Sequence, residues 1–408
     1  MSFVRSRRSL VPAALVALSV ALAGCGSGSS LNHPDTGADS GLHDVLGSSP
    51  ATPQAAVAVL HSNVRRGATD VPVDRRLQVT AEQGTLTAVR VESKAGAVAG
   101  KISDDGSSWT AAALLEPGTT YVVTSTAQDT SGKTVTRRTR FRTQPLTLAQ
   151  QTYPSFAPLA GETVGVGMPV IVKFDVPVTD HASIEKHLQV VAKPAQRGSW
   201  HWISDNEVHW RPASYWKPDT RVTVNADING VPAGHGIYGQ LDRSSSFTIG
   251  ASHVYKVNIA TDQLRVFDNG HLTRTIPVTT GMPGFTTRSG TKVIVEKDRY
   301  QTMNSETIGI DPNSALGYNL KDVEYAMRLT YSGEFLHAAP WSVASQGHAN
   351  VSNGCTGMST ANAGWLYRHS QIGDVVVYTG SSKMMTLTNG YGDWNVPFSQ
   401  YKTGSALS

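Results

Sequence analysis

The sequence predicts a mainly β protein made of several domains. The chain has 408 residues, which is long for one domain, and 39% of them are hydrophobic. Short segments that alternate apolar and polar residues recur between residues 55 and 250, where no helical period is found. The same pattern continues beyond residue 250, with one expected helix at 360–369. These observations favour tandem β domains with few helices.

An internal repeat predicts that two of these domains are alike. A repeat of about 100 residues indicates a domain duplication, and its size suits an immunoglobulin-like β-sandwich. We therefore expect one sandwich over residues 54–147 and a second over 148–250, acting as spacers or binding modules. The repeated residues, each displaced by 101 positions, are Ile102–Asp104, Trp109, Pro117 and Thr119 in the first copy and Ile203–Asp205, Trp210, Pro218 and Thr220 in the second.

The second copy is rich in tryptophan. An aromatic row of this kind could grip sugar rings, or it could fill a sandwich core or an interface with the next domain. The core or interface interpretation is favoured. The four side chains are Trp200, Trp202, Trp210 and Trp216.

A third β domain is expected over residues 251–380. Strands are predicted at 254–259, 264–267, 272–279 and 375–378. Asp268-Asn269-Gly270 is a strong hairpin signal. The helix at 360–369 is expected to begin at a cap formed by Ser359 or Thr360. Residues 381–408 are a C-terminal extension, expected to fold back as a brace through Trp394 and Phe398.

The N-terminus is expected to be an export and anchoring signal. Three arginines precede an apolar run of 15 residues, 10–24, which is short for a transmembrane helix. Residues 1–24 are therefore predicted to be a signal peptide. The run ends in Leu-Ala-Gly-Cys, which resembles the bacterial lipoprotein box, so Cys25 is the expected lipidation site. The alternative is an ordinary signal peptide with a chance cysteine.

The expected result of this processing is a lipid-anchored protein on the extracytoplasmic face of the cell membrane. Residues 25–53 are rich in Gly, Ser, Asp and Pro and are predicted to be a flexible tether.

Charge and composition exclude several other partners. The chain has 35 basic and 31 acidic residues, but three of the basic ones lie in the first 24 residues, which leaves 32 against 31. A balanced chain without a Lys/Arg cluster is not expected to bind nucleic acid. The 13 histidines are scattered and show no His-Glu-x-x-His spacing, so neither a metal nor a cofactor is expected. The sequence leaves the oligomeric state undetermined, with a monomer expected.

The second cysteine, Cys355, is a candidate nucleophile. It lies in a loop of small residues between Gly354 and Gly357, where the backbone can approach a ligand closely. A thiol nucleophile needs a base, and His337 and His348 are near in sequence. From these residues alone, a Cys–His pair for acyl transfer and a structural cysteine are equally supported.

A family resemblance favours the first alternative. His337, then 14 residues, then Ser352-x-Gly354-Cys355 resembles the signature of the L,D-transpeptidases with a YkuD-type catalytic domain. Tyr318 after Gly317, Trp341 in His-Ala-Ala-Pro-Trp-Ser-Val, and Gly-Asp-Trp-Asn at 392–395 resemble its actinobacterial, mycobacterial-type branch. That branch carries two immunoglobulin-like domains and is lipidated or otherwise anchored. The resemblance therefore implies that residues 251–380 are a mostly β L,D-transpeptidase catalytic domain.

The resemblance implies a cysteine acyl-enzyme mechanism on peptidoglycan stem peptides. Cys355 would attack a tetrapeptide stem at diaminopimelate, release D-Ala, and pass the acyl group to another stem as a 3→3 cross-link. His337 would be the general base and acid, held by a main-chain carbonyl such as that of Ala338. The backbone N–H groups of Gly354 and Cys355 would be the oxyanion donors. The thiol would also be acylated by carbapenems.

Further residues are expected around the substrate. Tyr318 and Trp341 would line the donor pocket, with plain packing as their alternative. His348 would either line the pocket mouth or anchor the loop, and the loop role is favoured. The segment Tyr331–Asn353 is the expected lid. The substrate-binding candidates are Tyr318, Trp341, Ser352, His348, Gly357 and Met303.

Two departures from the family pattern leave rival functions open. Asn353 stands where the family usually has His, and Gly357 where it usually has Asn or Arg. An amide cannot titrate near neutral pH, so Asn353 could serve only as a helper beside His337. One rival is an L,D-carboxypeptidase, in which water replaces the acceptor amine. The other is a non-catalytic lipoprotein that binds peptidoglycan through a degenerate site.

Overall fold

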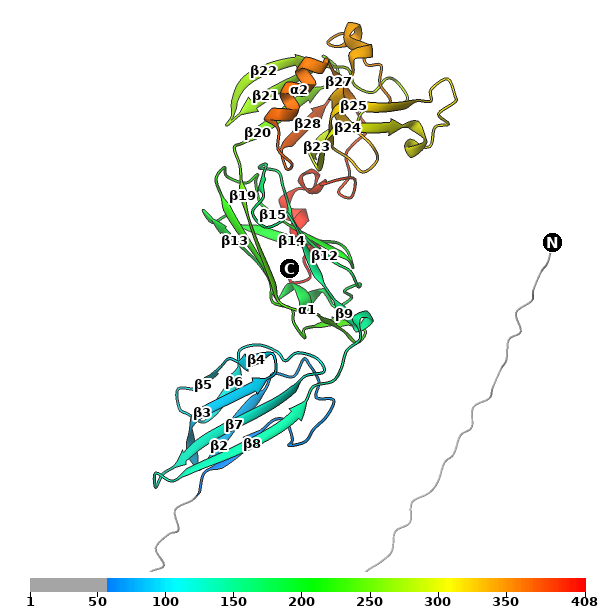
Figure 1. Cartoon of the computed structure of the whole chain (residues 1–408). Coiled ribbons are helices and arrows are strands. Elements are labelled where there is room, and N and C mark those ends of the chain that lie inside the picture. The colour runs from blue at the N-terminus through cyan, green and yellow to red at the C-terminus, as the bar shows by residue number, and fades with distance from the viewer. Residues whose placement is uncertain (1–56) are drawn as a thin grey trace, which may run out of the picture. The chain divides into compact units, whose positions relative to one another are not determined.

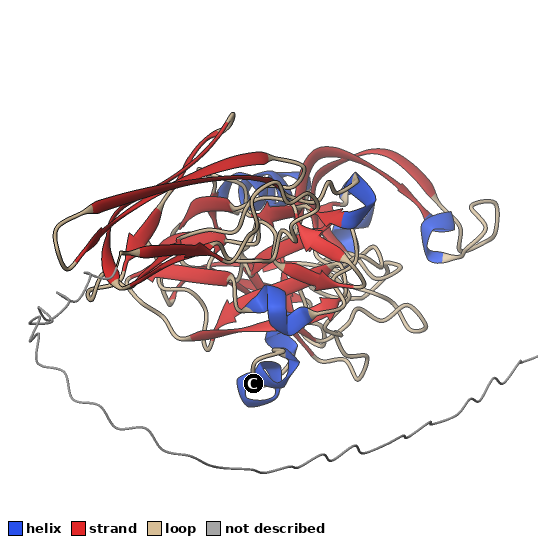
Figure 2. Cartoon of the chain, turned by 90° about the horizontal axis from the view of Figure 1, so that it is seen from below, coloured by secondary structure: helices blue, strands red, loops and turns tan. Residues whose placement is uncertain are grey.

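The computed structural model describes residues 57–408, and these residues are mainly β, as predicted (Figures 1 and 2). The predicted signal peptide, the tether and Cys25 lie outside the described residues. Within residues 57–408, no helix has the length and apolar character needed to cross a bilayer.

The first sandwich consists of two four-stranded sheets. One has the order β1-β2-β6-β5 and the other β4-β3-β7-β8. Buried residues alternate with less buried ones, most regularly in β7, and enclose a core around Trp109, Tyr121 and Phe141. The strands are β1 (Val59–Ser62), β2 (Gln78–Glu82), β3 (Gly84–Ser93), β4 (Gly96–Val98), β5 (Gly100–Ile102), β6 (Ser108–Ala111), β7 (Thr120–Asp129) and β8 (Thr134–Arg142).

The second sandwich pairs the sheet β10-β12-β15-β14 with the sheet β11-β19-β16-β13. A small sheet, β17-β18-β9, adjoins them. The elements are η1 (Leu148–Gln150), β9 (Gln151–Thr152), β10 (Pro154–Ala157), β11 (Thr163–Val164), β12 (Val170–Phe174), α1 (His181–Glu185), β13 (Leu188–Lys193), β14 (Gly198–Ser204), β15 (Glu207–Pro212), β16 (Arg221–Ala226), β17 (Pro232–Gly234), β18 (Ile237–Gly239) and β19 (Arg243–Ile249).

The sequence repeat corresponds to equivalent hairpins in the two sandwiches. Trp109 on β6 and Trp210 on β15 are both buried, and each ring covers a glycine of the preceding strand, Gly100 or Gly198. A side chain at either glycine would collide with the indole, so the repeat preserves a packing unit. The expectation of no helix before residue 250 is wrong at α1, whose five residues are too few to show a helical period.

The tryptophans of the second sandwich pack inward, which confirms the core interpretation. Trp200, Trp210 and Trp216 are buried in the core of this sandwich. Trp202 is partly buried and donates from Nε1 to a Glu185 carboxylate oxygen at 2.8 Å.

The third β region carries two sheets and the one long helix. The first sheet has the order β22-β21-β20-β28-β23 and the second β24-β25-β26-β27. The elements are β20 (His253–Asn258), β21 (Gln263–Asp268), β22 (His271–Pro277), β23 (Gly290–Val293), β24 (Glu296–Asn304), η2 (Ser305–Ile308), β25 (Asn319–Arg328), β26 (Phe335–Ala338), η3 (Pro340–Ser345), β27 (Thr356–Met358), α2 (Thr360–His369) and β28 (Val375–Thr379).

The local signals read from the sequence hold in this region. Asn269 and Gly270 have φ of 48° and 85°, as a tight turn between β21 and β22 requires. The Ser359 hydroxyl caps α2 by accepting from the Asn362 N–H. The strands agree with the predicted ranges to within two residues at each end.

The C-terminal segment joins the second sandwich to the third region. Its short helices are η4 (Asp393–Asn395), α3 (Phe398–Tyr401) and η5 (Lys402–Gly404). The Trp394 indole donates to the Gly167 carbonyl of the sandwich at 2.7 Å, and the Asn395 side-chain carbonyl accepts from the Thr291 N–H at 2.8 Å. Val375 of β28 also lies in the sandwich core. The expected brace is therefore present, while the domain boundaries themselves stay predictions.

Candidate active site

Most of the predicted site residues line one cavity of about 330 Å³ in the third region. Beside it lies a smaller cavity of about 90 Å³, and Cys355, Tyr318 and Met303 contribute to both. Cys355 therefore lies where the two cavities meet. The predicted residues that line the larger cavity are Met303, Tyr318, His337, Trp341, Ser352, Asn353, Cys355 and Gly357.

Parallel pairing of two short strands brings the base and the nucleophile together. β26 carries His337, and β27 begins directly after Cys355. The register pairs Leu336 with Thr356 and His337 with Gly357. All four residues of β26 are buried, so the pairing fixes the backbone on both sides of the predicted Cys–His pair.

His337 is held as a neutral base. Its Nδ1 lies 2.8 Å from the Ala338 carbonyl oxygen, so Nδ1 donates and the lone pair of Nε2 is left as an acceptor. Burial lowers the pKa of His337, and only the main-chain carbonyl opposes this effect. The imidazole is therefore uncharged at neutral pH, and Trp341 lies beside it with the ring centroids 6.0 Å apart.

Cys355 rests as a thiol rather than as a preformed thiolate. Its Sγ donates to the Gly333 carbonyl over 3.5 Å. Burial raises the pKa of Cys355 to about 11, although a main-chain hydrogen bond from Phe335 lowers it. The thiol must therefore lose its proton to a base as it attacks, and His337, which lines the same cavity, is the predicted base.

The two main-chain N–H groups predicted as oxyanion donors differ in their contacts. Its N–H donates to the Ser352 hydroxyl oxygen at 3.1 Å, and that hydroxyl donates to the Cys355 carbonyl at 2.6 Å. The Gly354 N–H is thus used inside the loop in this structure, and its role as an oxyanion donor stays a prediction. The Cys355 N–H has no hydrogen-bond acceptor within residues 57–408, so it is left for this role. One serine hydroxyl explains the difference.

The cavity wall opposite the loop comes from residues 315–318, before β25. The Asn353 amide donates to the Leu316 carbonyl at 3.1 Å, which ties the wall to the cysteine loop. Burial raises the pKa of Tyr318 to about 12, so its phenol stays protonated and can donate.

The lid predicted at Tyr331–Asn353 is wrong, because that segment contains the buried strand β26.

Two further predicted residues differ in their relation to the cavity. His348 is exposed, lies in the turn after η3, and does not line the cavity, so both its substrate-binding role and its loop role stay predictions. Gly357 packs against Ala339, and a Cβ at position 357 would lie 2.8 Å from the Ala339 Cβ. A side chain at position 357 would therefore require this wall to move.

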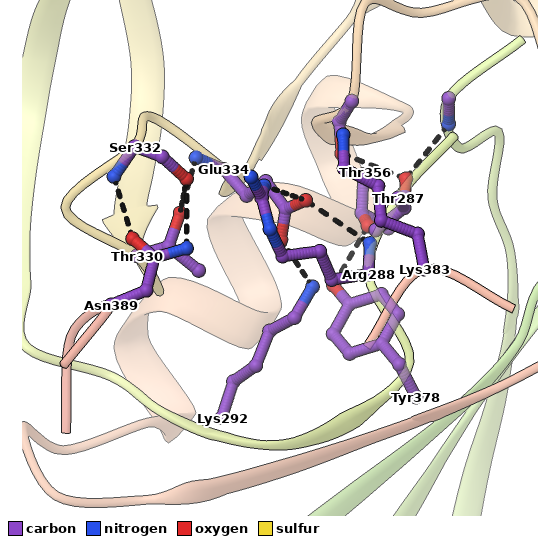
Figure 3. A network of polar contacts seen from close by, with 12 residues as sticks. Thr287, Arg288, Lys292, Thr330, Ser332, Glu334, Thr356, Tyr378, Lys383 and Asn389 are labelled. Atoms are coloured by element: carbon purple, nitrogen blue, oxygen red, sulfur yellow. Dashed lines mark hydrogen bonds and ion pairs between the residues drawn. The ribbon is translucent and has the colours of Figure 1, made fainter. Parts of the chain in front are cut away.

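Sequence analysis missed a buried ion network behind the cysteine loop. The Glu334 carboxylate pairs with the fully buried ammonium of Lys292 and, at 3.0 Å, with the Arg288 guanidinium (Figure 3). Burial lowers the pKa of Lys292 to about 8, while the charge of Glu334 opposes this effect. Lys292, a charged residue within the short strand β23, was the one sign of this network in the sequence. Its partner Glu334 lies 42 positions away, so the sequence did not link the two.

One cluster of side chains has the composition of a metal site, but its imidazole rings do not have the orientation that a metal requires. Ligand atoms of His253, Asp268 and His369 lie within 4.8 Å of one another. The two imidazole rings are 4.4 Å apart and tilted by only 33°, so their lone pairs do not converge on one point. His369 pairs with Asp268 at 2.8 Å, and His253 pairs with buried Asp374 at 3.2 Å. The cluster is thus a network of histidine–carboxylate hydrogen bonds.

Comparisons with known proteins agree with this geometry. Residues 252–377 match the family model of the L,D-transpeptidase catalytic domain, and residues 68–232 match that of a bacterial Ig domain. L,D-transpeptidase 2 of Mycobacterium tuberculosis is 35% identical, with 98% of this chain and 96% of the relative covered. L,D-transpeptidase 5 of the same species is 34% identical, with 83% of this chain and 75% of the relative covered.

A solved structure is also similar. The structure of the L,D-transpeptidase LdtMt1 in complex with imipenem is 35% identical with a TM-score of 0.50, covering 56% of this chain and 99% of that one.

Proposed function

This chain belongs to the L,D-transpeptidase family, and we propose that it forms 3→3 cross-links between peptidoglycan stem peptides through a thioester on Cys355. The observation that carries the proposal is the shared cavity in which a neutral, carbonyl-anchored His337 lies with the Cys355 thiol. Much of the remaining lining is apolar, including Met303, Leu316 and Trp341.

The geometry supports a general-base attack. His337 takes the thiol proton as Sγ bonds to the diaminopimelate carbonyl carbon of the donor stem. The negative charge that forms on the carbonyl oxygen is stabilised by the Cys355 N–H and by the protonated Tyr318 phenol. The bond to D-Ala then breaks, and His337 returns the proton to the departing amine.

The second half of the reaction reverses these roles. An amine of the acceptor stem attacks the thioester carbonyl while His337 takes its proton. The thiolate leaves and is reprotonated, and the new amide is the cross-link. Attack by water instead of the amine would make the enzyme an L,D-carboxypeptidase with the same residues.

The test is product analysis with purified full-length protein and disaccharide-tetrapeptide. We expect dimers with one D-Ala lost per link, detected by mass spectrometry, and none with Cys355→Ala. Tripeptide products without dimers would replace the transpeptidase by the carboxypeptidase. Turnover that does not depend on Cys355 would overturn both.

The location is a separate part of the proposal. A lipid on Cys25 and the tether 25–53 would hold the protein at the extracytoplasmic face of the membrane, on the cell-wall side. Metabolic labelling with an alkyne fatty acid should tag the wild-type protein, and Cys25→Ser should lose the tag and leave the membrane fraction. Unchanged labelling of that variant would contradict the anchor.

A further inference from the structure

The orientation of one peptide unit decides whether the Cys355 N–H can stabilise an oxyanion. In a trans peptide the carbonyl and the N–H point in opposite directions, so fixing the Gly354 carbonyl also aims the Cys355 N–H. Gly354 has φ of +124°, a conformation that only glycine adopts readily. Glycine restricts the rotation of the Gly354–Cys355 peptide only weakly. A hydrogen bond from elsewhere in the protein is therefore needed to hold this peptide.

Thr287 is that anchor. Its hydroxyl donates to the Gly354 carbonyl at 2.8 Å and accepts from the Gly281 N–H at 2.9 Å. The side chain is buried, with 1% of its surface exposed, so water does not compete for either bond. Because the Gly281 N–H occupies an oxygen lone pair, the hydroxyl proton is directed to Gly354.

The buried ion network fixes Thr287 in turn. The neighbouring Arg288 donates its main-chain N–H to the Glu334 carboxylate at 3.1 Å and its guanidinium to the same oxygen. Lys292 holds the other carboxylate oxygen. Figure 3 shows Glu334 between these two cations, beside Thr287. A doubly paired carboxylate in a buried site leaves little freedom to the segment that it binds.

The same network reaches the other flank of the nucleophile. The Lys292 ammonium lies 3.7 Å from the centroid of the Tyr378 ring, and the Tyr378 hydroxyl lies 2.7 Å from that of Thr356. Gly354 and Thr356, the two neighbours of Cys355, are therefore both fastened to side chains around Lys292.

We propose that Thr287 is a positioning residue that aims the Cys355 N–H at the developing oxyanion, and that the Lys292–Glu334 pair keeps Thr287 in place. The inference rests on the acyl-enzyme chemistry of the proposed function. It predicts that Thr287 matters for attack on a carbonyl and not for the reactivity of the thiol as such.

Two reactions of Cys355 separate these effects in the purified full-length protein. Imipenem acylation joins Sγ to the β-lactam carbonyl carbon, breaks the ring C–N bond and passes through an oxyanion. Iodoacetamide alkylation joins Sγ to a methylene carbon and releases iodide without one. Both adducts are followed by intact mass, for wild type, Thr287→Val, Thr287→Ala and Thr287→Ser, with thermal unfolding as the check on folding.

Thr287→Val keeps the shape but loses the hydroxyl, so imipenem acylation should slow by about 10-fold to 100-fold, approaching the loss of an oxyanion donor. Alkylation should stay within about 2-fold of wild type, since no donor is involved. Thr287→Ser keeps the hydroxyl and should acylate at close to the wild-type rate. Thr287→Ala should be slowed like Thr287→Val, and it takes the place of Thr287→Val if that variant does not fold.

Acylation of Thr287→Val at the wild-type rate would overturn the inference. So would a parallel fall in both reactions, which would mean that Thr287 acts on the thiol or the fold. The imipenem comparison needs no stem peptide, so the two proposals can fail separately. If Thr287→Val slows acylation but not alkylation while the wild-type protein forms no dimers, the proposed function is refuted and the inference stands.

Discussion

Two buried histidines show opposite ways of holding an imidazole inside this protein. His337 in the cavity faces a main-chain carbonyl, and burial lowers its pKa. His209 at the junction of the second sandwich and the C-terminal segment lies between Asp393 at 2.9 Å and Glu207 at 2.7 Å. Those carboxylates overcome burial and raise the pKa of His209 to about 9.

The difference separates a reacting group from a structural one. A carbonyl orients the ring without charging it, so His337 keeps a free lone pair for a proton from Cys355. Two carboxylates charge the ring and use both nitrogens, so His209 can only hold the junction together. The partner decides the protonation state, because both rings are buried alike.

The largest effect should come from removing the neutral base. His337→Gln keeps a polar side chain but cannot accept and return a proton, so kcat/KM for cross-linking should fall by about 10²-fold to 10⁴-fold. Iodoacetamide alkylation near pH 11 should persist, because hydroxide then ionises the thiol without His337. Alkylation lost together with cross-linking would indicate a damaged cavity instead, and Gln346→Ala, which changes a nearby buried amide, is the matched control.

The structural histidine should be sensitive to its carboxylates. Asp393→Asn leaves the fully buried His209 with one partner, and breaking a buried pair costs about 3 kcal/mol of unfolding free energy. Chemical denaturation should detect this loss, whereas the exposed Asp227→Asn should change stability by less than about 0.5 kcal/mol. Equal stabilities of the two variants would refute the role of the pair.

The same pair gives stability a defined pH dependence. His209 has a raised pKa, so its contribution is complete below the unfolded value of about 6.5 and is lost as pH rises through about 9. Asp393 has a lowered pKa, so its contribution is present above its ordinary value near 4 and is lost as pH falls. His209→Gln should flatten the alkaline decline, and an unchanged decline would assign it to other groups.

A carboxylate placed beside His337, the proposed base, should make its protonation resemble that of His209. Trp341 is exposed and lies next to the His337 ring, so Trp341→Glu should raise the pKa of His337. The acid limb of kcat/KM, expected below pH 6.5 in the wild type, should move up by about 0.5 to 1 pH unit. Trp341→Gln controls for the loss of the indole. If the acid limb of kcat/KM lies at the same pH in both variants, a charge at position 341 does not affect the pKa of His337.

The smallest effect should come from restoring the family's usual residue at position 353. Asn353 binds the Leu316 carbonyl, and a histidine can make the same bond, while His337 already supplies the base. Asn353→His should change kcat/KM by less than about 3-fold, well within the effect of one hydrogen bond. A gain of tenfold or more would show that a titrating group is needed there.

The sequence was most informative where one local signal decides the structure. The Trp109 and Trp210 repeat, the Asn269-Gly270 turn and the Ser359 cap each depend on residues close in the chain. The resemblance added the Ala338 carbonyl that holds His337, which no local pattern indicates.

The failures came where distant residues or single hydroxyl groups decide. The Ser352 hydroxyl takes the Gly354 N–H, which the motif alone does not show. Lys292 and Glu334 look like surface charges until the fold buries them together. The internal repeat predicted two similar domains, yet of the two described sandwiches the second shares its core with β28, through Val375.

The contacts of the C-terminal segment also set an order of events during folding. Asp393 meets His209 across 184 residues, Trp394 meets Gly167 across 227, and Ser405 meets Glu185 across 220. Contacts so far apart in sequence close large loops and form late. During synthesis the first sandwich can fold as soon as it emerges, whereas the contacts of the second sandwich with Asp393, Trp394 and Ser405 must wait for the end of the chain. A chain that ends before Asp393 would therefore keep Cys355 and His337 but lose the contacts of Asp393 with His209 and of Trp394 with Gly167.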